Sequence, residues 1–211
     1  MITKPPIVTP LFSWPLMRAL ITGVDEENNF IKNLFKDKDN FKPNVSNLIS
    51  KNKNILDYPE LLNLKNDIQK IANQFAFETL AYREVVVDLK QSWINISQPG
   101  QGHPPHFHPN TIFVGTYYPF GSGGGPLDFR NPNNFQIIPN TNPSGSDPMG
   151  MISRPSILVQ ANPGEVMLWL SPMIHSVGNN IGKEDRFSLA FNFMVRGELG
   201  YMDNVSYLSI K

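Results

Sequence analysis

The feature that most constrains the fold of this chain is a series of short, strand-like segments between residues 85 and 195, each bounded by Gly, Pro or Asn. The segments are Val85–Val87, Trp93–Ile96, Ile112–Tyr118, Pro126–Phe129, Ser156–Gln160, Gly164–Leu170 and Arg186–Val195. Beta-branched and aromatic residues favour strands, and short strands separated by turn residues are typical of antiparallel sandwiches and barrels. We therefore predict an antiparallel barrel or jelly roll for this half of the chain.

The residues before these strands predict two helices. Residues 24–35 form a short amphipathic pattern with Ile31 on the buried side, together with Leu34 and Phe35. A longer helix is predicted to open at Asp57, where Glu60 completes a capping-box-like pair. Its apolar stripe continues to about residue 80 through Leu61, Leu64, Ile68, Ile71 and Phe75. Such a stripe predicts a helix that packs against a sheet.

The remaining segments are interpreted as connections. Residues 5–21 look like an extended lead-in with an edge strand at Ile7–Phe12, and the charged, Asn-rich residues 36–53 are predicted to form a surface loop. Residues 131–155 are long and aperiodic, which suggests a lid beside a site. The Gly-rich residues 121–125 lack a following Lys-Ser/Thr and do not open a helix, so a hairpin turn is favoured over a phosphate loop.

Composition limits the classes of function. With 211 residues the chain fits a single domain, 1–211, in which residues 1–84 are a helical lead-in and residues 85–200 the β core. The formal net charge is zero, which gives no electrostatic case for nucleic acid or an anionic membrane. There is no cysteine, hence no disulfide or thiolate site. We read no signal peptide and no membrane span, so the expected location is the cytoplasm.

The histidines are the first candidate site. Three of the four lie at positions 103, 106 and 108, and the fourth is His175. In an extended backbone, residues i and i+2 lie on one face, so His106 and His108 can share one ligand. Imidazole suits divalent iron, copper, nickel and zinc. We predict that His106, His108 and His175 hold one metal, while His103 is a surface residue or contacts these ligands from outside.

The last strand carries a second candidate feature. Arg186 and Ser188 share one face of this strand, and its Phe and Leu residues take the other. A guanidinium with a hydroxyl one pleat away can anchor a carboxylate. A buried Arg needs an anionic partner, which a ligand carboxylate would supply. The alternative is a surface ion pair with Glu184 or Asp185.

Taken together, these segments resemble the Fe(II)- and 2-oxoglutarate-dependent oxygenases, in particular a bacterial and phage branch related to the prolyl hydroxylases. The resemblance covers residues 90–196 through HFHPN, TYYPF, LDFRNP, PGEVMLWLSPMIHSV and DRFSLAFNF. Members carry an H-x-D/E…H triad, followed by R-x-S after the distal His. The resemblance implies a mainly β fold with α: a double-stranded β-helix (a jelly-roll or cupin-like barrel) with N-terminal helices packed on one sheet.

Carried over residue by residue, His106 matches the first His of the triad and His175 the distal one. Arg186 and Ser188 match the pair that binds the distal carboxylate of 2-oxoglutarate, and Tyr118 matches a Tyr that hydrogen-bonds the same group. The implied cofactors are Fe(II), 2-oxoglutarate and O2, with ascorbate as an additive in vitro. The implied reaction is hydroxylation of an aliphatic C–H in a small-molecule or peptidyl substrate.

His108 departs from the family pattern, because a carboxylate is expected there. Three interpretations stay open: His108 completes a three-His site, His108 turns aside and Asp128 or a water completes the shell, or the metal site is degenerate. Two other classes of protein also stay open, namely a non-catalytic cupin-like metal-binding or structural protein and a three-His dioxygenase that does not use 2-oxoglutarate. A homodimer is an alternative to a monomer.

Overall fold

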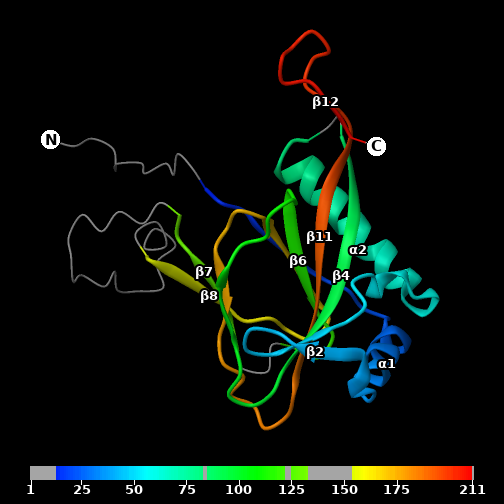
Figure 1. The fold of residues 1–211 in the computed structure, drawn as a ribbon, viewed down its shortest axis with the longest axis vertical. Coiled ribbons are helices and arrows are strands. Elements are labelled where there is room, and N and C mark those ends of the chain that lie inside the picture. The colour runs from blue at the N-terminus through cyan, green and yellow to red at the C-terminus, as the bar shows by residue number, and fades with distance from the viewer. Residues whose placement is uncertain (1–12, 83–84, 122–124, 133–153, 211) are drawn as a thin grey trace, which may run out of the picture.

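The computed structural model describes residues 13–82, 85–121, 125–132 and 154–210, which form two antiparallel sheets with helices beside the larger one (Figure 1). The larger sheet has the order β1-β9-β6-β11-β4-β3-β2, with β12 paired to β11. Its strands are β1 Leu16–Leu20, β2 Phe41–Pro43, β3 Leu48–Ser50, β4 Val86–Ser97, β6 Phe113–Tyr118, β9 Glu165–Leu170, β11 Arg186–Leu199 and β12 Leu208–Ile210.

The smaller sheet has the order β5-β10-β7-β8. Its strands are β5 His103–His106, β7 Leu127–Arg130, β8 Ser156–Val159 and β10 His175–Val177. All of the strand segments predicted between residues 85 and 195 are strands, and most of their ends shift by only one or two residues. The first two predicted segments are joined in the single strand β4. The last strand, β11, continues four residues beyond its predicted end. The predicted jelly-roll topology is thereby confirmed.

Helices α1 (Asp25–Leu34) and α2 (Leu62–Gln74) lie on the side of the long strands that faces away from β7 and β8 (Figure 1). They share one apolar core with the outward side chains of β4, β6, β9 and β11. Ile31 is fully buried, and Leu34 and Phe35 pack partly buried against this core. The predicted stripe is also confirmed, because Leu61, Leu64, Ile68 and Phe75 are buried and Ile71 is partly so.

The predicted start of the second helix is wrong. Short 3-10 turns cover Ile55–Asp57 and Pro59–Leu61, and α2 begins only at Leu62 without a side-chain cap. Asp57 instead accepts a hydrogen bond from Nζ of Lys65, at 2.7 Å. The helix ends in a π turn over Phe75–Thr79, which carries the chain to the sheet.

The predicted surface loop over residues 36–53 is also wrong in two places, since β2 and β3 extend the larger sheet from β4. Each of these strands is three residues long, which is too short for an alternating pattern to stand out among charged neighbours. The edge strand predicted at Ile7–Phe12 and most of the predicted lid at 131–155 lie outside the described residues, as does the middle of the Gly-rich turn.

The alternation of side chains along the larger sheet separates two interiors. One face joins the helical core, and the other faces the smaller sheet, where a second apolar cluster is formed by Val114, Tyr118, Leu127, Phe129, Ala161, Met167, Trp169 and Met173. A cavity of about 360 Å³ opens beside this second cluster. The side of each strand on which a residue falls therefore decides whether it supports the helices or reaches the cavity.

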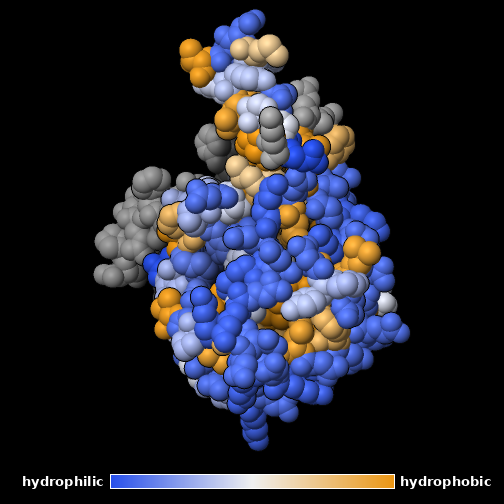
Figure 2. All heavy atoms as spheres, turned by 45° about the vertical axis from the view of Figure 1, so that its right-hand side comes forward, coloured by the Kyte–Doolittle hydropathy of each residue, from blue (hydrophilic) through white to orange (hydrophobic). Residues whose placement is uncertain are grey.

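Beyond the two-sheet body, β11 and β12 continue as a hairpin. Figure 2 shows apolar side chains on this projection, and Tyr201, Met202 and Val205 are strongly exposed. Among the described residues, no helix is long and apolar enough to cross a membrane.

Candidate metal centre

Three imidazoles converge between the two sheets. His106 ends β5 and lies directly opposite His175, the first residue of β10, in the antiparallel pairing of these strands. The backbone N–H of His108 donates to the carbonyl of Ser171, at 3.3 Å, in the turn that leads to β10. One ligand nitrogen from each of the three histidines lies within 4.8 Å of the other two. The predicted set is therefore brought together as a group that can hold one metal ion.

The hydrogen bonds of the three rings determine which nitrogen is available. Nδ1 of His106 lies 2.9 Å from the Pro104 carbonyl oxygen, and Nδ1 of His175 lies 3.0 Å from that of Met173. Nδ1 of His108 lies 2.8 Å from Oδ1 of an Asn side chain on β11. Carbonyl oxygens only accept, so each Nδ1 carries the proton and each Nε2 keeps its lone pair. Metal-binding histidines are oriented by outer hydrogen bonds of this kind.

Burial lowers the pKa of all three imidazoles below the usual 6.5. The pKa of His175 falls to about 3, first because of burial and then because His106 lies beside it. The hydrogen bonds made by each Nδ1 oppose this shift without reversing it. All three rings are therefore neutral at pH 7, which is the state that binds a metal.

His103 and Asp128 are not in this group. The His103 ring packs edge-on against His106, with centroids 4.4 Å apart, so it contacts a candidate ligand from outside as predicted. Asp128 pairs with Ser176 across β7 and β10 and lines a separate hollow with Arg130. The geometry thus favours His108 over Asp128 as the third ligand.

A buried arginine lies at the other end of the cavity. Arg186 is 6% exposed and no carboxylate of the described residues pairs with it, so the alternative ion pair with Glu184 or Asp185 is not formed. Its Nη1 donates to the carbonyls of Gly125 and Gly178, at 3.2 and 3.1 Å, and its Nη2 donates to Oγ of Ser97, at 2.9 Å. A guanidinium has five N–H donors, so these three bonds leave two for a ligand.

Burial lowers the pKa of Arg186, and the nearby Tyr118 opposes this shift. The group nevertheless stays charged, because an arginine keeps its proton throughout the physiological range. A buried cation without an anion is unfavourable, and the missing anion is the group that a bound carboxylate would supply.

Gly125 makes room for this guanidinium. A Cβ atom on Gly125 would lie 2.0 Å from Nη1 of Arg186 and 2.5 Å from the carbonyl oxygen of Gly178. Only a residue without a side chain can stand here while Arg186 keeps its position. Gly125 is the last residue of the Gly-rich run that predicts a turn, and it also forms the wall of the Arg186 site.

Three hydroxyl groups also line the cavity, those of Tyr118, Ser188 and Thr116, and none of them has a hydrogen-bond partner in the part of the chain that the structure describes. Tyr117 points the opposite way, and its hydroxyl donates to Oδ1 of Asn28 on α1, at 2.8 Å. Thr116 is not among the predicted site residues, although its place two residues before Tyr118 puts both side chains on one face.

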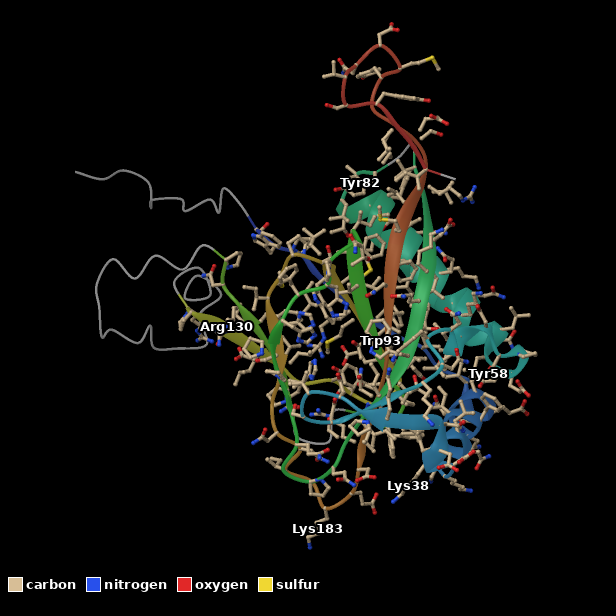
Figure 3. The ribbon with its side chains drawn as sticks, in the orientation of Figure 1. Lys38, Tyr58, Tyr82, Trp93, Arg130 and Lys183 are labelled. Atoms are coloured by element: carbon tan, nitrogen blue, oxygen red, sulfur yellow. The ribbon has the colours of Figure 1, made fainter. Side chains whose placement is uncertain are left out.

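Another part of the cavity lining is mostly polar and uncharged, and it includes Asn44, Asn47, Gln91, Trp93 and Asn95. Trp93 is half-buried in the cavity wall, between the long strands and the smaller sheet (Figure 3). Its ring stacks on His108, with centroids 5.7 Å apart. Apart from Arg186, no Asp, Glu, Lys or Arg is among the described lining residues.

Comparison with known proteins gives one family. Residues 91–192 match the family model described as "Putative 2OG-Fe(II) oxygenase". No curated protein matches the sequence. Among solved structures, the epimerase SnoN from nogalamycin biosynthesis, in complex with Fe3+, alpha ketoglutarate and nogalamycin RO, is similar at a TM-score of 0.62 and 15% identity, covering 85% of this chain and 78% of that one.

Two prolyl hydroxylases are also similar. The prolyl-4-hydroxylase of Pseudomonas putida has a TM-score of 0.57 and 13% identity, covering 87% of this chain and 93% of its own. The enzyme of Trichoplax adhaerens, in complex with a hypoxia inducible factor peptide, has a TM-score of 0.59 and 12% identity, with 85% and 83% covered. These likenesses establish the double-stranded β-helix fold.

Proposed function

Because the chain belongs, through residues 91–192, to the 2OG-Fe(II) oxygenase family, we propose that His106, His108 and His175 hold its iron(II), and that Arg186, Ser188 and Tyr118 bind the distal carboxylate of 2-oxoglutarate. The protein is a 2-oxoglutarate-dependent dioxygenase. The reaction proposed for it is the hydroxylation of an aliphatic C–H bond. The residue roles rest on the site itself, since distant structural relatives share only the fold.

One observation carries the assignment. Three neutral imidazoles with free Nε2 atoms and a buried arginine without an acid line the same cavity. The imidazoles fit a divalent metal, and the arginine fits a carboxylate. A ligand that chelates a metal and also carries a distal carboxylate matches both ends, and 2-oxoglutarate is such a ligand.

Iron(II) with 2-oxoglutarate and O2 would supply the oxidising chemistry, and the protein residues would supply position and surroundings. The Nδ1 hydrogen bonds hold the three imidazoles with Nε2 toward the metal. Arg186 and the hydroxyls of Ser188 and Tyr118 orient the diacid. The apolar cluster around Trp169 limits access of water to the buried side of the cavity.

The third histidine changes the charge of the centre. Three imidazoles are neutral, whereas the family pattern of two histidines and a carboxylate contributes one negative charge. A metal held by His106, His108 and His175 therefore keeps more of its positive charge, which makes it more electrophilic and raises the importance of anionic ligands.

The uncharged amides of the cavity lining bear on the substrate. Amide side chains both donate and accept hydrogen bonds, and Arg186 is the one Asp, Glu, Lys or Arg among the described lining residues, so an ionised substrate group would meet no further opposite charge. We propose that the part of the substrate entering the cavity is neutral, whether it belongs to a small molecule or to a peptide.

The test is turnover of 2-oxoglutarate. Purified protein is incubated with Fe(II), ascorbate and 2-oxoglutarate in air, and succinate is measured; slow turnover without substrate suffices. The Arg186→Ala variant is expected to lose succinate formation and 2-oxoglutarate binding while its metal affinity stays unchanged. Arg196→Ala is the matched control, because Arg196 lies on the same strand in an exposed ion pair with Asp88.

The two other classes give different results. A metal-binding protein without turnover would form no succinate while retaining the metal. A three-His dioxygenase independent of 2-oxoglutarate would bind metal equally well but show the same 2-oxoglutarate affinity in Arg186→Ala as in the unmodified protein. Either result would contradict the assignment of Arg186.

We propose further that residues 1–211 act as one domain in the cytoplasm, with residues 1–84 supporting the barrel. The shared core of α1, α2 and the larger sheet supports this arrangement. Size-exclusion chromatography with light scattering distinguishes a monomer from a homodimer. Limited proteolysis that released a stable fragment of residues 85–200 would contradict the single domain.

A further inference from the structure

We propose that the hydroxyl of Thr116 is a further cosubstrate-binding group, which donates a hydrogen bond to an oxygen of the 2-oxo acid end of the ligand, the end nearest the metal. This inference rests on the proposed function. It adds a residue that neither the family pattern nor the three distal carboxylate ligands include.

The first observation concerns the hydroxyl itself. Thr116 is 7% exposed, lies in the middle of β6 and lines the cavity. Its hydroxyl has no hydrogen-bond partner within the described ranges. Oγ1 of Thr116 is also not among the fully buried polar atoms that lack a partner, so it is accessible from the cavity. The hydroxyl can therefore donate a hydrogen bond to a ligand that enters the cavity.

The second observation is where this hydroxyl lies along the cavity. On β11 the side chains that line the cavity follow the order Arg186, Ser188, Ala190 and Asn192. Arg186 is at the proposed carboxylate end, and Asn192 holds His108 at the metal end. Thr116 pairs with Ala190 in the sheet, so it lies between these two ends.

The neighbouring strands agree with this order. Ala190 also pairs with Trp93 on β4, and the Trp93 ring stacks on His108. Tyr118, two residues further along β6, lies toward Arg186 and is proposed to bind the distal carboxylate. Thr116 therefore lies closer to the metal end of the cavity than Tyr118 does. It is in register with Ala190 and Trp93, and Trp93 contacts the proposed metal ligand His108.

The chemistry of the ligand then selects the partner. Between its two ends, 2-oxoglutarate has only methylene groups, which accept no hydrogen bond. The oxygens on the metal side of these methylenes belong to the 2-oxo group and the adjacent carboxylate. A hydroxyl donor fits either oxygen, and the lack of a protein carboxylate on the metal leaves the anionic charge of this ligand as the main acceptor there.

The test separates the two ends of the ligand. Dissociation constants are measured by calorimetry on Mn(II)-loaded protein without O2, for 2-oxoglutarate and for 2-oxopentanoate, which keeps the 2-oxo acid and lacks the distal carboxylate. Thr116→Val is expected to weaken both ligands by the same factor, roughly tenfold or more. Thr116→Ser restores the hydroxyl and is expected to bind both ligands within about threefold of the unmodified protein.

Arg186→Ala and Tyr118→Phe provide the contrast, because they should weaken 2-oxoglutarate and leave 2-oxopentanoate unchanged. Mn(II) affinity and the melting temperature of each variant establish that the centre and the fold are intact. Thr116→Val is the isosteric change, and β-branched residues suit a strand, so this variant is expected to fold.

The outcomes are distinguishable. If Thr116→Val binds both ligands like the unmodified protein, or weakens 2-oxoglutarate alone, the inference is overturned while the proposed function stands. If the unmodified protein binds no 2-oxoglutarate, the proposed function fails and the inference fails with it.

Discussion

Nδ1 of His108 lies 2.8 Å from Oδ1 of Asn192, which is 84 residues further along the chain. Nδ2 of Asn192 in turn lies 3.3 Å from Oε1 of Gln91, and this bond orients the amide with its oxygen toward the imidazole. An amide oxygen only accepts, so His108 presents an unprotonated Nε2 to the cavity. The histidine that departs from the family pattern is therefore held as a metal ligand would be.

Removing the hydrogen bond between His108 and Asn192 should weaken metal binding. We expect Asn192→Ala to lower the affinity for Mn(II) or Fe(II) by roughly 10–100-fold, because the imidazole loses its tautomer and orientation. Asn192→Asp keeps an acceptor oxygen and should retain the affinity. Anaerobic calorimetry measures both. Asn95→Ala is the control, since Asn95 lines the same cavity and makes no hydrogen bond to a histidine of the described residues; an equal loss in that variant would point to general disruption.

Substitutions of His108 and of Asp128 test which of the two residues is the third metal ligand. We expect His108→Ala to lose more metal affinity than the roughly 10–100-fold of an outer hydrogen-bond partner, and Asp128→Asn to lose none. The reverse pattern would assign the third position to Asp128. His108→Asp, which recreates the family triad, should bind Fe(II) and is a check that the cavity accepts a carboxylate there.

Gly125→Ala should weaken the binding of 2-oxoglutarate, although it replaces no charged residue. The added Cβ would lie 2.0 Å from Nη1 of Arg186, so the guanidinium has to leave its position. We expect 2-oxoglutarate affinity to fall by about tenfold or more, as for the loss of a charge-assisted hydrogen bond, while Mn(II) affinity is unchanged. Calorimetry with each ligand provides the measurement. An unchanged 2-oxoglutarate affinity would show that the position of Arg186 is not critical.

A partly buried ion pair connects the edge strand β1 to β9, with Arg18 on its exposed side. Nη2 of Arg18 lies 2.9 Å from Oε2 of Glu165, whose side chain is 8% exposed. Burial by itself would raise the pKa of Glu165, but hydrogen bonds from Arg18 and Asn162 outweigh it, so the pKa lies below its usual 4.5. The pair therefore stabilises the fold above about pH 4.5, and this contribution is lost as the pH falls through the folded-state pKa.

We expect Glu165→Gln to lower the free energy of unfolding by about 1–2 kcal/mol at pH 7. The difference from the unmodified protein should shrink in urea titrations at pH 4 and below. Asp57→Asn is the matched control, because its ion pair with Lys65 is exposed and should contribute about 0.5 kcal/mol or less. A difference that did not depend on pH would show that packing, and not the charge of Glu165, is responsible.

Much of the fold and site was predictable from local patterns. Strand alternation predicted that Arg186 and Ser188 share one face, and both line the cavity. This prediction succeeded because the period of a strand is a property of the backbone, which neighbouring residues report directly. His106 and His108 also reach one site, although β5 ends at His106 and His108 follows it.

Other features left no usable trace in the sequence. β2 and β3 are too short for a period to appear, and they form because β4 offers them an edge to pair with. Thr116 was missed because a Thr in a strand is ordinary. Its role emerges only when its unpartnered hydroxyl is seen between the arginine and the histidines.

The sequence by itself determined which residue types can bind metal and carboxylate, and that Arg186 and Ser188 share one face of their strand. Only the tertiary structure decided that the two sets meet in one cavity, that Arg186 is buried without an acid, and that Asn192 rather than a neighbour in the chain orients His108. The physical reason is that a strand's period is local, whereas strand register, burial and hydrogen bonds between distant residues arise only when the sheets pack.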